Sequence, residues 1–158
     1  MLHSTKLTIS SADYNSFSFE VCYNKNLIDV KLTYNVYGVV VSGDVVVSDV
    51  QISNGDITIT TDRKGSFSIL NLEGEHAFNL TKAYHSFDIN SFIVNKNTEL
   101  IINSTYNISG IALNGEEPVV GVDVMLTKYS SGETLSTLTD SEGKYSFNDT
   151  SGTNLLFY

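Results

Sequence analysis

Residues 139–147 read TDSEGKYSF and residues 61–69 read TDRKGSFSI, so one turn with its following alternating segment occurs twice, 78 positions apart. Further upstream, YNVYGVVVSG at 34–43 returns as YNISGIALNG at 106–115, and VVVSDVQIS at 45–53 returns as VVGVDVMLT at 119–127. The offset grows from 72 to 78 only at joints rich in polar residues and Gly, where loops tolerate insertion. The chain is therefore built on an internal repeat.

The start of the chain matches the end of the first repeat. Residues 7–35 align with 80–107, which places Leu7-Thr8 on Leu80-Thr81, Ser18-Phe19 on Ser91-Phe92, and Val30 on Ile102. We therefore predict three parts: residues 1–33 as the last strands of a module, 34–105 as a complete module, and 106–158 as the beginning of another.

Apolar and polar residues alternate through these parts, as in Phe17, Phe19, Val21 and in Ile28, Val30, Leu32. A period of two is typical of half-buried strands. The composition agrees, because Val, Ile, Thr, Tyr and Phe are abundant. Gly65 can supply the positive φ of a tight hairpin at 62–65. The predicted fold is all-β, with tandem sandwich modules of about seven strands and a terminal module split between the chain ends.

The charge pattern argues against several partners. The net charge is −9 and the nine basic residues are scattered, so we expect no binding to nucleic acid or to anionic lipid. No apolar run is long enough for a membrane insertion segment, and MLHSTKLTIS at 1–10 lacks the apolar stretch of a signal peptide. Cys22 is the single cysteine, and we expect a small buried side chain there.

The stretch PVVGVDVML at 118–126, followed by TDSEGKYSF at 139–147, resembles the carboxypeptidase regulatory-like and Cna-B-like repeats of the transthyretin-like superfamily. The resemblance covers 106–147 well and 34–105 more weakly, because Asp44 and Val47 replace the signature Pro and Gly. It implies an extracellular or cell-surface scaffold and not an enzyme. The opening strands contain no Lys for an isopeptide bond, and the chain lacks the closing Tyr-Arg-Gly-Ser motif of the hydroxyisourate hydrolases with this fold.

Two unfinished halves of one module lead to a prediction about assembly. Burying about six apolar side chains of the missing strands is worth on the order of 10 kcal/mol, at roughly 1.5–3 kcal/mol each. We predict that residues 1–33 of one subunit complete 106–158 of the next by donor-strand complementation, giving a head-to-tail filament of identical copies. The predicted donor face is Phe17, Phe19, Val21, Ile28, Val30 and Leu32, and the predicted acceptor groove is Ile108, Val122, Val124, Leu126, Tyr145 and Phe147.

The sequence gives weaker indications of other kinds of site. We predict no catalytic residues, no cofactor and no metal, since His76 and His85 would lie on opposite faces of one strand and the Asp62 and Asp140 turns lack the dense oxygen ligands of a Ca²⁺ loop. Exposed Tyr such as Tyr37 or Tyr129 can stack on glycans. N-glycosylation sequons occur at Asn79, Asn103, Asn107 and Asn148.

Two other functions fit the same residues. The sequence is also consistent with a segment of a long stalk or adhesin, in which neighbouring modules of the same chain supply the missing strands. A carbohydrate-binding accessory module is the third reading, and it predicts saturable glycan binding by the monomer.

Overall fold

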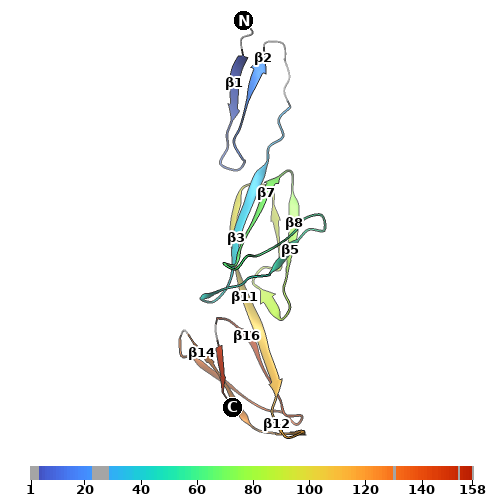
Figure 1. The fold of residues 1–158 in the computed structure, drawn as a ribbon, viewed down its shortest axis with the longest axis vertical. Coiled ribbons are helices and arrows are strands. Elements are labelled where there is room, and N and C mark those ends of the chain that lie inside the picture. The colour runs from blue at the N-terminus through green and yellow to red at the C-terminus, as the bar shows by residue number, and fades with distance from the viewer. Residues whose placement is uncertain (1–3, 23–28, 130, 153, 158) are drawn as a thin grey trace.

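The computed structural model describes residues 4–22, 29–129, 131–152 and 154–157, and within these ranges the chain is all-β with no helix. The molecule is elongated, with an N-terminal hairpin at one end, a β-sandwich in the middle and a second, smaller β-unit at the other end (Figure 1). The expected all-β fold of tandem sandwich modules is confirmed.

The N-terminal hairpin consists of β1 (Ser4–Ile9) and β2 (Phe17–Cys22), which pair antiparallel with Leu7 opposite Phe19. Residues 29–33 then run to the sandwich without forming a strand. The prediction of a strand through Val30 and Leu32 is therefore wrong for this structure, because the segment has no neighbouring strand to bond with. Ile28 lies outside the described residues.

The middle sandwich consists of two facing sheets. One sheet has the order β10-β8-β5-β6, and in the other β3 lies between β7 and the parallel first half of β11, with β4 beside its end. The strands are β3 (Tyr34–Ser42), β4 (Val45–Val46), β5 (Gln51–Ser53), β6 (Thr58–Thr60), β7 (Ser66–Leu72), β8 (His76–Thr81), β9 (His85–Phe87), β10 (Ser91–Val94) and β11 (Thr98–Ile111).

The two sheets enclose one hydrophobic core. Tyr34 is fully buried in this core, and its hydroxyl donates to the carbonyl oxygens of Gly74 (2.8 Å) and Val94 (2.9 Å). Burial, and then the nearby Glu75 carboxylate, raises the pKa of Tyr34 above its ordinary value. The other buried apolar residues of this core are Val36, Val40, Val47, Val50, Ile52, Phe67, Ile69, Leu72, Phe78, Leu80, Phe92, Val94 and Ile102.

β11 connects the two units as one continuous strand. Its first half pairs with β3 from Thr98 to Asn103, and its second half pairs with β16 from Ile108 to Ile111 (Figure 1). The second unit continues the long axis of the sandwich (Figure 1), and the pairing of β11 with β16 shifts register between Tyr106 and Ile108 at the junction.

The C-terminal unit repeats the beginning of the sandwich. β14 lies between β15 and β17, as β5 lies between β6 and β8, and β16 pairs with β11 as β7 pairs with β3. The described part of residues 106–158 contains no counterpart of β10 or of the first half of β11. The strands are β12 (Leu113–Asn114), β13 (Glu117–Pro118), β14 (Asp123–Lys128), β15 (Thr134–Leu138), β16 (Lys144–Thr150) and β17 (Asn154–Phe157).

The Thr-Asp-x-x-Gly turn has a different role from the one expected. Gly65 has the predicted positive φ of 70°. However, β6 and β7 belong to different sheets, so the turn crosses between the layers and does not close a hairpin. A Cβ on Gly65 would lie 2.5 Å from the carbonyl oxygen of Val40, so no larger residue fits there.

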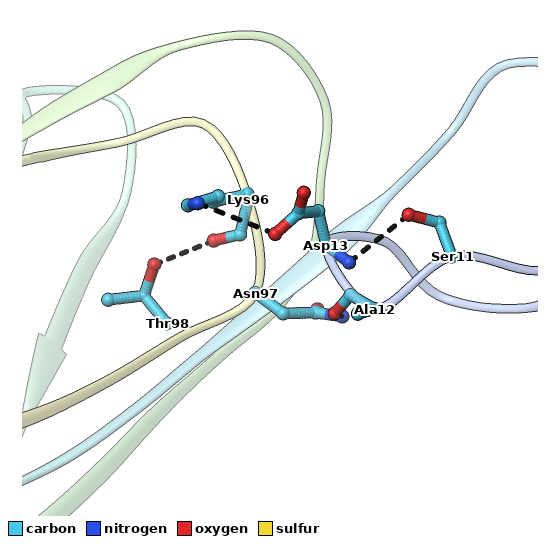
Figure 2. Close-up of polar contacts among 6 residues, drawn as sticks. All are labelled: Ser11, Ala12, Asp13, Lys96, Asn97 and Thr98. Atoms are coloured by element: carbon cyan, nitrogen blue, oxygen red, sulfur yellow. Dashed lines mark hydrogen bonds and ion pairs between the residues drawn. The ribbon is translucent and has the colours of Figure 1, made fainter.

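Polar contacts attach the loop of the hairpin to the sandwich (Figure 2). Asn97 donates its backbone N–H to the Asp13 carbonyl (2.7 Å) and its side-chain amide to the Ala12 carbonyl (3.2 Å). Lys96 forms an ion pair with Asp13 at 3.4 Å, and Asn15 donates to the Thr33 carbonyl at 2.7 Å. The hairpin is thus held at its loop, while its strands project beyond the sandwich (Figure 1).

The two units differ in how tightly they hold one aromatic ring. A Cβ on Gly38 would lie 2.4 Å from the Phe67 ring, which is packed in the core, and a Cβ on Gly110 would lie 2.4 Å from the Tyr145 hydroxyl. We expect Gly38→Ala to destabilise the protein by about 1–3 kcal/mol through overpacking. Gly110→Ala should cost less, because Tyr145 is only partly buried and can turn away. Urea unfolding of both variants tests this, and an equal loss would contradict the looser packing of the C-terminal unit.

Candidate assembly interface

The six predicted acceptor residues lie together in the C-terminal unit. Val124, Leu126 and Phe147 are buried, and Ile108, Val122 and Tyr145 pack against them. These residues come from β11, β14, β16 and the segment before β14. Among the described residues this cluster has three buried apolar members, whereas the core of the middle sandwich has fourteen. In its described part, the C-terminal unit therefore has a much smaller buried core than the middle sandwich.

An apolar hollow of about 520 Å³ lies beside this cluster. Three residues of the cluster, Val122, Val124 and Tyr145, line it. Its remaining lining residues are Ile111, Ala112, Leu113 and Val119.

In the middle sandwich, the counterpart of Tyr145 belongs to an aromatic stack. This counterpart is Phe67, and both rings lie against a glycine of the paired neighbouring strand. The ring of Phe92, from β10, lies 6.3 Å from the ring of Phe67 and 5.5 Å from that of Phe78. The described part of the C-terminal unit has no counterpart of β10, and the ring next to Tyr145 is that of Phe147 on the same strand, at 6.3 Å.

The predicted donor residues lie at the opposite end of the molecule (Figure 1). Phe17 is 48% exposed and its ring lies 5.4 Å from that of Phe19, while Phe19 and Val21 are half-buried. Val30 is half-buried and Leu32 is 36% exposed, both in the connecting segment. None of these five belongs to either core cluster. The structure therefore does not bring donor and acceptor together within one chain.

The sequence analysis missed two residues of the same hairpin face. Leu7 is 43% exposed and lies opposite Phe19, and Ile9 lies opposite Phe17. Their alternation with polar residues was the available signal. The alignment of Leu7-Thr8 with Leu80-Thr81 is also wrong by two residues, since Phe19 pairs with Leu7 whereas Phe92 pairs with Phe78. The loop of the hairpin is shorter than the one between β8 and β10, which hides this shift in the sequence.

The histidines lie on separate strands, which corrects the prediction of opposite faces of one strand. His76 begins β8 and its ring stacks on Phe78 at 6.0 Å, with Asn54 3.0 Å from Nδ1. His85 begins β9, and its Nδ1 lies 2.7 Å from the Ser104 hydroxyl. Partial burial, and then the Lys82 ammonium, lowers the pKa of His85.

The remaining predicted sites are on the surface. The four sequon residues Asn79, Asn103, Asn107 and Asn148 are all exposed. Asn103 donates its side-chain amide to Asp88 at 2.8 Å, so a glycan there would have to replace this bond. Tyr37 is 46% exposed and Tyr129 is 72% exposed, and they belong to different units.

The comparisons with known proteins give limited similarity. No family model matches the chain. Chitinase ChiA of Flavobacterium johnsoniae is 33% identical over 127 residues, which is 72% of this chain, but the match spans only 8% of that protein's length. Among solved structures, a streptococcal ancillary pilin aligns with a TM-score of 0.35 and 14% identity, over 95% of this chain and 63% of the pilin. The Bacillus anthracis TIE protein aligns with a TM-score of 0.38 and 12% identity, over 99% and 38%.

In the part of the chain that the structure describes, no helix has the length and apolar character needed to cross a membrane.

The Asp140 carboxylate stabilises the turn that leads into β16. Its Oδ1 accepts the backbone N–H groups of Glu142 (2.8 Å) and Lys144 (2.9 Å), as Asp62 Oδ1 accepts those of Lys64 and Ser66. The N–H of Lys144, and then that of Glu142, lowers the pKa of Asp140. A lowered pKa means that the charged form stabilises the folded state, so this contribution is lost as the pH falls through the folded pKa.

We therefore expect the Asp140 carboxyl carbon to titrate below the ordinary range of Asp in an NMR pH series. Asp140→Asn keeps an acceptor oxygen but no charge, and it should remove part of the acid-induced loss of stability. Asp123→Asn, at an exposed position of β14, is the control. An ordinary midpoint for Asp140 would contradict the role of these two N–H groups.

Proposed function

We propose that this protein is a non-enzymatic, extracellular structural protein whose copies join head to tail, with residues 1–33 of one copy completing the sandwich that residues 106–158 of the next begin. The observation that carries the proposal is the unfinished core of the C-terminal unit, directly beside a finished copy of the same repeat. The repeat also identifies what is absent, namely strands of the kind found in 1–33.

The shape of the molecule supports assembly into a fibre. The donor segment and the acceptor unit lie at opposite ends, and β11 keeps the sandwich and the acceptor unit in line (Figure 1). Two different surfaces at opposite ends give a heterologous contact, which propagates instead of closing into a dimer. The expected product is an open filament.

The proposal assigns Val30 a buried place in the next copy. Its counterpart Ile102 is fully buried in the middle sandwich, where it pairs with Val40 of β3. In the present chain Val30 is half-buried and outside any strand. Pairing beside the second half of β11 would give it the environment that Ile102 has.

An extracellular location is supported by the family resemblance of residues 106–147 and by the exposure of all four sequons. The carboxypeptidase regulatory-like or Cna-B-like assignment is part of this proposal. So is the absence of catalysis, since the repeat accounts for the conspicuous sequence motifs as structural elements.

Val30→Asp tests the proposal. A carboxylate at a position that becomes fully buried carries a large desolvation cost, so we expect assembly to be abolished while the middle sandwich stays folded. Light scattering and negative-stain microscopy measure assembly, and circular dichroism measures folding. The matched control is Ile93→Asp, whose side chain is 68% exposed on β10, and it should assemble like the unmodified protein. Normal polymerisation of Val30→Asp would refute the donor assignment.

A stalk or adhesin made of tandem repeats is the nearest alternative, and in it a neighbouring module of the same chain completes the C-terminal unit. The packing would be the same, but the strands would be supplied covalently. A chain that stays monomeric at high concentration, with its hollow still open, would favour this alternative over the filament.

An accessory module of a carbohydrate-active protein is a second candidate, and the similarity to part of a chitinase favours it. This function requires binding by single copies. It predicts saturable retention of the monomer on chitin beads and a several-fold weaker retention of Tyr129→Ala, because Tyr129 is the more exposed of the two proposed stacking residues. No retention of the unmodified monomer would exclude chitin as its ligand.

A further inference from the structure

The N-terminal hairpin has the same construction as the β8–β10 pair of the finished sandwich. Both pairs are antiparallel, and Phe19 lies opposite Leu7 as Phe92 lies opposite Phe78. The sequences around the two aromatic residues agree, Ser-Phe-Glu-Val at 18–21 and Ser-Phe-Ile-Val at 91–94. Register and sequence together make β1 the counterpart of β8 and β2 the counterpart of β10.

The C-terminal unit already has a strand at the β8 position. β17 pairs with β14 so that Leu156 lies opposite Leu126, and β8 pairs with β5 so that Leu80 lies opposite Ile52. Leu126 is the counterpart of Ile52 in the repeat. β17 and β1 are therefore both counterparts of β8, and both correspond to the position beside β14.

The two strands differ at a core position. In this register, Asn154 of β17 stands where the finished sandwich has Phe78, which is fully buried. β1 has Leu7 at that place, and Ile9 where the sandwich has Leu80. A Leu at the Phe78 place and an Ile at the Leu80 place both gain free energy from burial. The β1 sequence therefore has an apolar residue at both core places of this strand.

We propose that the β1–β2 hairpin of a second copy docks as a unit on the C-terminal unit, with β1 replacing β17 on the edge of β14 and Phe19 entering the hollow beside Tyr145. This rests on the proposed function and specifies its contact. Phe19 then repeats the contact of Phe92 with Phe67, and Leu7 and Val21 take the places of Phe78 and Val94.

The charge and exposure of the hairpin fit this occupant. Its inward face includes the apolar residues Leu7, Ile9, Phe17, Phe19 and Val21, of which Leu7 and Phe17 are exposed and the others half-buried in the single chain. Its outward face contains Lys6 and Glu20, which lie opposite each other and both are exposed. One face is thus apolar and suited to burial, and the other is charged and suited to contact with solvent. β17 covers the edge of β14 until a hairpin arrives, which limits exposure of an unpaired strand.

The absence of Trp from the chain allows a direct test. Phe19→Trp introduces a single fluorophore, and a trace amount of this variant is titrated with an excess of the unmodified full chain. We expect a saturable blue shift of the Trp emission, because residue 19 passes from partial exposure to a closed apolar site. Glu20→Trp, next to it on the outward face, is the matched control and should shift little.

The replacement of β17 is tested with a second titrant, the full chain with Leu156→Asp. A carboxylate opposite Leu126 weakens the pairing of β17 with β14 and leaves the middle sandwich unchanged. We expect the Phe19→Trp tracer to bind this titrant at a several-fold lower concentration than the unmodified chain. Equal or weaker binding would overturn the replacement of β17.

The outcomes separate this contact from the general proposal. If light scattering detects association but the Phe19→Trp emission does not move, copies join in another way, and the docking of Phe19 is wrong while head-to-tail assembly stands. If no association occurs at any concentration, the proposed function itself fails.

Discussion

The closing of two facing β-sheets over a shared apolar layer is the constraint on which this molecule depends. In residues 34–105 both sheets are complete, and Tyr34, Ile52, Phe78 and Ile102 are sealed from water. In residues 106–158 the same strand order begins, but the strand that would supply the ring over Tyr145 is missing from the described part. A half-closed layer leaves apolar surface in water, and the proposed association would bury this surface.

β11 joins the two units and determines how they are arranged. A single strand completes one sandwich with its first half and begins the next with its second half, so the repeats cannot separate into domains on a flexible linker. The loop of the hairpin is bound in a similar way at the other end, through Asp13 and Asn15. The hairpin and the C-terminal unit are therefore each attached to the sandwich by defined backbone contacts, and the proposed fibre requires such fixed attachment.

Much of the fold could be predicted from the sequence, because the chain contains two copies of one repeat and each copy can be compared with the other. The alternation and the matched turns predict the sheets, and the acceptor residues from Ile108 to Phe147 do form one cluster. Register could not be predicted at the hairpin, because a shift of two residues keeps every side chain on its face and leaves the pattern unchanged. The prediction of a strand at Val30 was wrong for another reason. A strand forms only when a neighbouring strand bonds to it, and the sequence of the segment does not show whether such a neighbour is present.

The turn at Asp62 illustrates the same limit at a smaller scale. Its Asp and its positive-φ Gly were recognisable, since the residue types alone specify that geometry. Whether such a turn joins two paired strands or crosses between two sheets depends on the strands that flank it, and β6 and β7 pair elsewhere. Local chemistry thus determines turns, and long-range pairing determines what the turns connect. For the C-terminal unit, the described residues include no counterpart of β10, and the proposed function assigns that strand to another repeat.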